Sequence, residues 1–324
     1  MTNAVTGRMG LFAFGWGKRP PTIEAITDLT VAAESFGFDS VHIPWHVTLA
    51  SSFDWGNRHN LDPLVILPYL AARTSEIGLA LNPWTVSTYH PFHWAQYIAT
   101  LDYVSGGRAI SGLSKLFLAD DAQVGNAVMS DADATFDEGL AVIAQLLTPK
   151  GSYDGESKTW NMDGLALDPK PSRDIPIWIS GGDDQAIERA ARFGHYLKPV
   201  GLTPDEYATR VRPALDQASA PHGRSVKISS SVVVFVQAES DDERWVDEHV
   251  MPLVHKRLHG KPLDDGSIVG TPEECARRIT ALFASGVDHL LLDTFFHGWE
   301  TEEFGIEQLR RISDLVAPMV EIAE

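Results

Sequence analysis

The sequence contains one cysteine and no long run of apolar residues. The lone Cys275 excludes an internal disulfide and any metal cluster built on several thiolates, which suits a reducing compartment. Its position within a predicted helix favours packing over a role as a nucleophile. No stretch reaches the roughly 18 apolar residues that span a membrane, and residues 1–10 lack the apolar core of a signal peptide. We therefore expect a soluble, cytoplasmic protein.

Positive charge is scarce in this chain. Its 26 Lys and Arg residues stand against 44 Asp and Glu residues, which gives a formal net charge of -18. Proteins that bind nucleic acid use Lys and Arg to neutralise phosphates, and anionic membrane surfaces attract the same side chains. The sequence therefore predicts neither a nucleic acid nor a membrane as a partner, and the acidic excess favours solubility.

The short motifs of several large enzyme classes are also missing. The chain has no G-x-G-x-x-G, no P-loop, no H-E-x-x-H and no G-x-S-x-G. Their absence weakens the hypotheses of a dinucleotide-binding protein, a P-loop NTPase, a metalloprotease and an α/β-hydrolase. His255 and His259 lie four residues apart on a predicted helix, a spacing that suits metal binding, but no third ligand is evident. We therefore expect no metal site.

What the chain does contain is a regular alternation of short apolar runs and amphipathic segments, with no Gly/Ser tract, Pro-rich stretch or charge block to mark a linker. The clearest unit covers residues 77–115. Its apolar runs at 77–81 and 109–113 have the length of strands, and the apolar residues between them, at 92–104, recur three and four apart. A connection of this length joins parallel strands, which need cover on both faces.

The same alternation predicts eight strands and the helices between them. The predicted strands are 10–14, 39–44, 77–81, 109–113, 176–180, 196–200, 226–236 and 290–295. The predicted helices are 21–35, 63–73, 92–104, 133–147, 181–193, 204–218, 241–258, 272–284 and 303–322. Such a pattern forms either a doubly wound open sheet or a closed barrel, and the strand count favours one (β/α)8 TIM barrel with insertions over residues 1–324. The remaining long segments are predicted loops, at 45–61, 116–132, 149–174 and 261–269.

One segment resembles a family signature. Residues 97–108, YIATLDYVSGGR, resemble the A-T-L-D-x-x-S-x-G-R run of the bacterial luciferase-like flavin-dependent monooxygenases, which leads into the fourth strand of a (β/α)8 barrel. Similar segments at 9–16, 270–274 and 286–289 extend the resemblance over nearly the whole chain. The resemblance implies a single luciferase-like TIM barrel.

The same resemblance implies an oxidoreductase that uses reduced FMN and O2 to oxygenate a small organic substrate. It implies a separate flavin reductase, since the chain has no NAD(P)H-binding fingerprint, and a homodimer. Two alternatives stay open: a deazaflavin-dependent oxidoreductase that transfers hydride on the same barrel, and a flavin-binding partner subunit without turnover. The anionic tail of a deazaflavin could bind Lys115, Lys170 and Arg173, whereas Asp183 and Asp184 would oppose it.

Two places are candidates for binding the flavin phosphate. Arg108 stands where the family uses an arginine for this purpose, and a guanidinium suits a dianion. The alternative is that Arg108 ties the strand to a carboxylate such as Asp102. Ser180, Gly181 and Gly182 end a predicted strand and open a helix, so their backbone N–H groups favour an anion, and the family places the phosphate here. The two acidic residues that follow would cap this helix and repel a phosphate.

The resemblance places the flavin ring beside Ala80, Leu81 and Asn82, at the end of a predicted strand. The family often has a non-proline cis peptide here, and the small Ala80 would allow close approach of the ring. An ordinary strand end before Pro83 is the alternative. Residues 112–117 carry side chains where the family has a Gly-x-Gly stretch, so we expect a narrower space near the cofactor.

His46 is the predicted catalytic residue. It follows the second predicted strand and matches a histidine that many family members place over the flavin, where an imidazole can move a proton near neutral pH. A structural role is the alternative. Further aromatic and histidine side chains near predicted strand ends could line a pocket for an apolar or planar substrate. They are Trp16, Trp45, Trp55, His90, Phe296 and His297.

Overall fold

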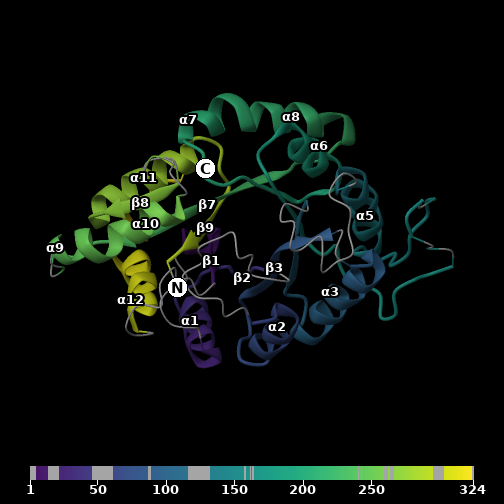
Figure 1. The fold of residues 1–324 in the computed structure, drawn as a ribbon, viewed down its shortest axis with the longest axis horizontal. Coiled ribbons are helices and arrows are strands. Elements are labelled where there is room, and N and C mark those ends of the chain that lie inside the picture. The colour runs from purple at the N-terminus through teal and green to yellow at the C-terminus, as the bar shows by residue number, and fades with distance from the viewer. Residues whose placement is uncertain are drawn as a thin grey trace.

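The computed structural model describes most of the chain, and its helices lie around a central set of strands (Figure 1). The described residues are 5–13, 22–45, 61–86, 89–115, 132–156, 158–160, 162, 164–239, 241, 243–258, 262, 266–294 and 303–322.

Within these ranges nine strands form one parallel sheet, and eight of them close into a ring. The strands are β1 (Met9–Phe12), β2 (Ser40–Ile43), β3 (Gly78–Thr85), β4 (Ala109–Ser114), β5 (Ile177–Ser180), β6 (Tyr196–Lys198), β7 (Lys227–Val236), β8 (Ser267–Gly270) and β9 (His289–Asp293). The strands β1 to β6 pair in sequence order, β6 pairs with β7, β7 pairs with β9, and β9 pairs with β1. The closure confirms the predicted barrel and excludes the open sheet.

The ninth strand corrects the prediction of a loop at 261–269. The first half of β7 pairs with β6 and β9 inside the ring, whereas its second half, from Val233, pairs with β8 outside it. The residues of β8 were not predicted as a strand, because only two of the four, Ile268 and Val269, are apolar. Its pairing depends on the length of β7, which extends beyond the barrel.

Most helices begin where they were predicted, because a side chain accepts a hydrogen bond from the first turn. The capping residues are Thr22 for α1, Asp62 for α2, His90 for α3, Asp183 for α6 and Thr271 for α11. None of the helices in the described ranges is long and apolar enough to cross a membrane. The α-helices are α1 (Ile23–Ser35), α2 (Pro63–Ala71), α3 (Pro91–Ser105), α5 (Ala132–Leu146), α6 (Asp184–Phe193), α7 (Pro204–Glu206), α8 (Arg212–Ser219), α9 (Glu243–Trp245), α10 (Met251–Arg257), α11 (Pro272–Ala284) and α12 (Glu303–Arg311).

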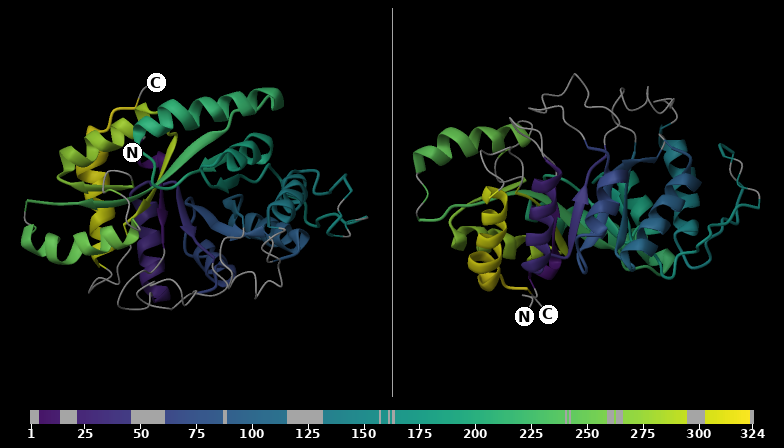
Figure 2. Two further views of the ribbon diagram at one scale, coloured as in Figure 1. Left: turned by 45° about the horizontal axis from the view of Figure 1, so that its top comes forward. Right: turned by 90° about the horizontal axis from the view of Figure 1, so that it is seen from below.

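The helices α9 and α10 form a side arm next to the barrel. In both views of Figure 2, the light-green α10 lies at the edge of the molecule, far from α3 and α5. A small separate apolar cluster joins this arm to the outer half of β7, with Val233 and Phe235 packed against Val246, Val250 and Val254. The arm is therefore held by the part of β7 that has left the barrel.

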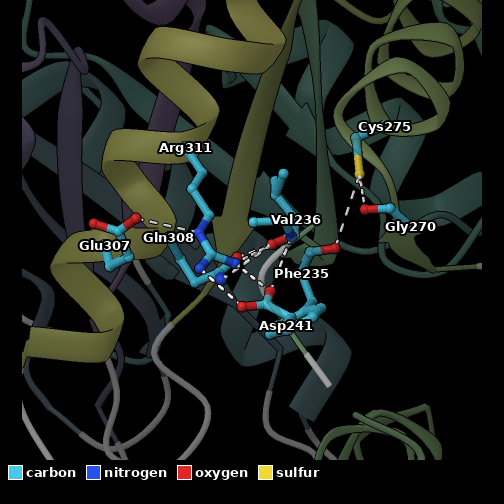
Figure 3. A network of polar contacts seen from close by, with 9 residues as sticks. Phe235, Val236, Asp241, Gly270, Cys275, Glu307, Gln308 and Arg311 are labelled. Atoms are coloured by element: carbon cyan, nitrogen blue, oxygen red, sulfur yellow. Dashed lines mark hydrogen bonds and ion pairs between the residues drawn. The ribbon is translucent and has the colours of Figure 1, made fainter. Parts of the chain in front are cut away.

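The end of β7 is closed by side chains rather than by another strand on its inner side (Figure 3). Both backbone polar groups of Val236 bond the amide of Gln308 on α12, at 2.8 Å for its N–H and 3.3 Å for its carbonyl. Arg311 donates to the same carbonyl at 2.9 Å and to both oxygens of Asp241 at 2.5 and 3.1 Å. On the other side, the buried Cys275 thiol of α11 lies 3.8 Å from the carbonyl of Phe235. The predicted packing role of Cys275 is confirmed.

Successive strand residues face either the helices or the barrel interior, since side chains alternate along a strand. Most of the residues that face the helices are apolar, fully buried and part of one large core. They include Leu11, Val41, Leu79, Leu113, Ile179, Leu197 and Leu290. This layer between strands and helices stabilises the barrel.

Candidate active site

Many of the side chains that face the interior of the barrel are polar or aromatic. The rings of His42 (β2) and Trp178 (β5) meet at 4.6 Å between centroids, although their strands lie on different sides of the ring. Trp178 also stacks on Tyr196 (β6) at 4.3 Å and touches His289 (β9) at 5.0 Å. The interior of a (β/α)8 barrel is usually filled by branched apolar residues. The departure here marks the interior as the candidate site.

A chain of hydrogen bonds links the inward-facing polar groups of β2 and β3. Ser40 Oγ donates to Asp39 Oδ1 at 2.6 Å and lies 2.9 Å from His42 Nε2. His42 Nδ1 lies 2.9 Å from Asn82 Nδ2. Asp39 precedes β2 and is one-third exposed, whereas Ser40, His42 and Asn82 are fully buried. The chain therefore runs from the amino end of the barrel towards its carboxyl end.

A second branch starts at the same carboxylate. His289 Nε2 lies 3.0 Å from Asp39 Oδ1, and Ser229 Oγ lies 2.9 Å from His289 Nδ1. A buried polar group costs free energy unless it is hydrogen-bonded, so the two branches keep the polar interior compatible with folding.

Burial sets the protonation of two of these rings. It lowers the pKa of His42 well below its usual value, and the nearby His289 and Lys198 lower it further. Burial also raises the pKa of Tyr196 to about 12, with Asp39 contributing in the same direction. The His42 imidazole and the Tyr196 phenol are therefore both neutral near pH 7.

Unpartnered polar atoms gather towards the carboxyl end of the barrel. Four of the buried side-chain oxygens that have no hydrogen-bond partner among the described residues belong to Asn82, Ser180, Ser231 and Thr294, on or next to β3, β5, β7 and β9. Such atoms are rare in folded proteins and call for an explanation. A polar ligand at this mouth would supply the missing partners.

A cation also lies at the mouth. Lys198 ends β6, pairs in register with Ser180, and is only 3% exposed. Its ammonium group lies 5.5 Å from the centroid of the Phe12 ring, within the range of a cation–π contact. The mouth therefore combines hydrogen-bonding groups, aromatic rings and a positive charge.

The segment predicted to lie beside the flavin ring is part of a longer strand. The strand β3 does not end at Asn82 but continues to Thr85, with a shift in its pairing to β4 between Leu81 and Trp84. The cis peptide in this segment is Asn82–Pro83, so the expected non-proline cis bond is replaced by one that precedes proline. Leu81 belongs to the apolar layer under the helices, and Asn82 reaches His42 in the interior.

Gly112 is a requirement of this packing. A Cβ atom at Gly112 would lie 2.3 Å from Asn82 Cγ and 2.4 Å from its Oδ1, so the Asn82 side chain occupies the space that a side chain on β4 would need. The space near the cofactor, which was expected to be narrowed by the side chains of residues 112–117, is narrowed at Gly112 by the Asn82 carboxamide instead. Residues 116 and 117 lie outside the described ranges.

The turn at Ser180, Gly181 and Gly182 opens α6 as predicted, but part of its N–H set is already used. Asp183 caps the helix by accepting from Ala186 N at 2.7 Å, and Gly181 N donates to Lys198 O at 3.1 Å. The prediction that the acidic residues cap this helix is confirmed for Asp183. The cradle that remains for an anion is smaller than the sequence suggested.

Arg108 lies at the amino end of β4, opposite the mouth. Its guanidinium donates to the carbonyls of Ser105, Ile77, Ala71 and Thr74 at 2.8 to 3.2 Å, and to the Thr74 hydroxyl at 2.9 Å. These contacts match the alternative in which Arg108 ties the start of the strand to its surroundings, although the partners are carbonyls and not Asp102.

Asp102 instead pairs with Arg173, at 2.6 Å. Arg173 also donates to Ala109 O at the start of β4, so it lies at the amino end of the barrel, away from the mouth. Lys115 pairs with Asp133 at 3.1 Å. Two of the three cations suggested for a deazaflavin tail are thus already paired with carboxylates.

Two of the predicted pocket residues are described, and both have structural contacts. Trp45 is buried beside Trp84 and Tyr89, with ring centroids 6.3 and 6.0 Å away. His90 caps α3 through Nδ1, which accepts from Phe92 N at 3.2 Å. The other predicted residues lie outside the described ranges. They are His46, Trp16, Trp55, Phe296 and His297.

Sequence reasoning missed His42, His289, Lys198 and the serines of the interior. The signal that could have found them is polar alternation within predicted strands. Ser40 and His42, Tyr196 and Lys198, and Ser229 and Ser231 are each two residues apart. Side chains with this spacing share one face of a strand, so polar pairs in buried strands indicate a polar barrel interior.

Comparison with known proteins connects this fold and site to a family. Residues 9–262 match the family model described as luciferase-like monooxygenase. The chain is also 24% identical to the pyrimidine monooxygenase RutA of Rhizobium rhizogenes, and the match covers 94% of this chain and 93% of RutA.

Two further relatives differ in cofactor. The F420-dependent glucose-6-phosphate dehydrogenase of Kineococcus radiotolerans is 29% identical over 205 residues, but the match spans only 59% of the dehydrogenase and 62% of this chain. The oxygenating constituent of 3,6-diketocamphane monooxygenase from Pseudomonas putida, solved with FMN, has a TM-score of 0.75 at 18% identity and covers 98% of this chain and 99% of that chain. At such low identity the likeness shows the shared fold.

Proposed function

The chain belongs to the luciferase-like monooxygenase family, and from this premise we propose that it uses reduced FMN and O2 to oxygenate a small organic substrate. The observation that carries the proposal is the polar and aromatic barrel interior, which ends at the mouth in four oxygens that have no hydrogen-bond partner among the described residues. A flavin ring is planar, offers both hydrogen-bond donors and acceptors, and would meet these groups. When bound, it supplies the electrons for the reaction with O2.

The described residues fit such a cofactor at the mouth. Ala80 has no side-chain bulk beyond Cβ and is fully buried, so a ring can approach β3 closely. Asn82 and Ser180 offer polar atoms that have no partner within the described part of the chain. At the turn of Gly181 and Gly182, the N–H of Gly181 donates to Lys198 O, so the backbone N–H of Gly182 is the one offered beside the start of α6, where an anion is favoured. We assign the flavin phosphate to this turn and not to Arg108.

Below the mouth, the neutral rings of His42, Trp178 and Tyr196 fill the barrel and exclude water from the cofactor side that faces the interior. Exclusion of water strengthens the polar contacts at the mouth and limits side reactions. We retain His46, which follows β2, as the proposed residue that moves a proton.

FMN is favoured over a deazaflavin by charge. Asp183 and Asp184 are exposed beside the phosphate turn, where a long anionic tail would meet them. The match to RutA also spans nearly the whole chain, whereas the match to the F420-dependent enzyme does not. The deazaflavin-dependent oxidoreductase remains the second candidate, because that relative has the higher identity.

We also propose a separate flavin reductase and a homodimer. The outer surfaces of α2 and α3 expose Val65, Tyr69, Tyr103 and Val104, of which Tyr103 is 74% exposed. Exposed apolar patches mark interaction surfaces, so these helices are the proposed dimer contact. Light scattering of the purified protein measures the mass directly and would contradict the homodimer if it returned a monomer.

Anaerobic titration tests the function. Reduced FMN and reduced F420 are added separately to the purified protein, and the bound fraction is read from the absorbance and fluorescence of each cofactor. We expect binding of reduced FMN, followed by oxidation when O2 is admitted. Binding of F420 alone would select hydride transfer. Binding of FMN without any change in its reaction with O2 would support the non-catalytic partner subunit.

A further inference from the structure

The Asn82 carboxamide is the most constrained polar group at the mouth. It is fully buried, its Nδ2 lies 2.9 Å from His42 Nδ1, and its Oδ1 has no hydrogen-bond partner among the described residues. The backbone of Gly112 leaves room for it where any side chain would collide. The structure thus has space for a carboxamide whose Nδ2 is hydrogen-bonded and whose Oδ1 has no partner among the described residues.

The carboxylate of Asp39 fixes the direction of every bond in this chain. A carboxylate only accepts, so the hydroxyl of Ser40 must donate its one proton to Asp39. Ser40 Oγ must then accept from His42, which places the imidazole proton on Nε2. His42 Nδ1 is therefore an acceptor, and Asn82 must present its NH2 group to it. The amide oxygen is left on the other side, next to Gly112.

The second branch supports the same assignment. His289 bonds Asp39 through Nε2 and Ser229 through Nδ1, so it holds the carboxylate from β9, on the other side of β1. The environment of His42 also contains the positive charge of Lys198, which disfavours a second proton on the ring. The neutral tautomer with the proton on Nε2 is consistent with both features.

We propose that His42 is a positioning residue that orients Asn82, so that Asn82 Oδ1 accepts a hydrogen bond from a ring N–H of the bound cofactor. The inference rests on the proposed function, because the donor belongs to the flavin-type cofactor at the mouth. Asn82 makes the contact, and His42, Ser40 and Asp39 act through it. The orientation is set at the amino end of the barrel, on the side away from the cofactor.

Two substitutions at His42 separate orientation from space filling. In His42→Asn, the amide oxygen takes the place of Nδ1 and still accepts from Asn82. In His42→Gln, the amide nitrogen takes the place of Nε2 and still donates to Ser40, but nothing accepts from Asn82. Both variants remove the ring that packs on Trp178, so they make a matched pair.

The full-length variants are titrated with reduced FMN and with reduced F420. We expect affinity for the bound cofactor within about threefold of the unmodified protein in His42→Asn, and about a tenfold loss in His42→Gln, the effect of one misdirected buried hydrogen bond. Equal losses in the two variants would mean that His42 only fills space, which overturns the proposal.

A double-mutant cycle adds the link to Asn82. Asn82→Leu keeps the size of the side chain and removes both polar ends, so it should weaken cofactor binding about tenfold or more. His42→Gln should then cause no further loss in the Asn82→Leu background, because coupled residues are not additive. Additive losses would overturn the proposal.

A measurement without cofactor distinguishes failure of this inference from failure of the proposed function. Nitrogen-15 NMR of the unmodified protein, with labelled histidine, reports which ring nitrogen of His42 carries the proton. A proton on Nε2 from pH 6 to 8 is expected, and a proton on Nδ1 would overturn the proposal directly. If neither cofactor binds while the Nε2 tautomer is present, the proposed function fails, and the cofactor contact at Asn82 fails with it.

Discussion

The same strands present two surfaces that differ in chemistry but not in burial. Towards the helices, Leu11, Leu79 and Leu290 are fully buried in an apolar layer. Towards the interior, His42 and Asn82 are equally buried but hydrogen-bonded. Apolar burial supplies free energy of folding, whereas a buried hydrogen bond contributes little net and is costly when broken. The outer surface thus maintains the barrel, and the inner surface is available for a site.

The largest effect is expected from the outer surface. We expect Leu79→Ala to lower the free energy of unfolding by about 3 kcal/mol, because it removes buried carbon atoms and leaves a cavity. Cofactor affinity of the folded protein should not change. Chemical denaturation and cofactor titration measure the two quantities. Val31→Ala on the exposed face of α1 is the control and should change stability by less than about 0.5 kcal/mol. Loss of affinity in Leu79→Ala would show that the two surfaces are not independent.

A comparable but smaller loss is expected at the amino end of the barrel. Arg108→Ala leaves four backbone carbonyls without their guanidinium partner, so stability should fall by about 2 kcal/mol while cofactor affinity is retained. Arg108→Lys should recover part of the stability, since an ammonium can bond some of these carbonyls. A large loss of flavin affinity in a stable Arg108→Ala protein would instead restore the phosphate role suggested by the resemblance.

The inner surface should make stability depend on pH. Because the pKa of His42 is lowered by folding, the unfolded chain takes up a proton near its ordinary pKa of about 6.5 while the folded chain does not. Its contribution is present above that pH and is lost as the pH falls below it, by about 1.4 kcal/mol per pH unit. His42→Asn should flatten the curve of unfolding free energy between pH 6.5 and 5 by this slope. An unchanged slope would mean that His42 is charged in the folded protein.

The smallest effect is expected at the mouth itself. Asp183→Ala removes the cap of α6 and should lower stability by about 1 kcal/mol. It also removes a negative charge beside the proposed phosphate turn, so affinity for FMN should rise slightly, and more so at low salt. Asp183→Asn keeps the cap without the charge and separates the two effects. If Asp183→Asn binds FMN no better than the unmodified protein, the phosphate lies elsewhere.

The order of strands and helices could be predicted from the sequence because the outer surface follows simple rules. Apolar runs at strand length, helical periodicity and capping residues such as Thr271 all have a local cause. The strand β8 could not be predicted, because the sequence shows the length of β7 but not that its second half leaves the ring and pairs with residues 267–270.

The site was predictable only in part. The sequence shows the residue type of each candidate, but the role of a residue depends on where its side chain points and what it contacts. The resemblance assigned Arg108 to the phosphate, but its acceptors are backbone carbonyls, which leave no mark on the sequence. Asn82 was in the predicted cofactor segment, but its partner His42 is 40 residues away. The sequence does contain polar residues two apart within buried strands, and this spacing could have predicted the hydrogen-bond network in the barrel interior.

The Cys275 thiol provides a way to measure how often the contact between β7 and α11 opens. It is the only cysteine of the chain, it is buried between α11 and the outer half of β7, and burial raises its pKa to about 12. Thiol reagents react with the thiolate, so the native protein should be almost inert to them. Each labelled molecule would then record one opening of the β7–α11 contact, so the rate of labelling measures how often this contact opens.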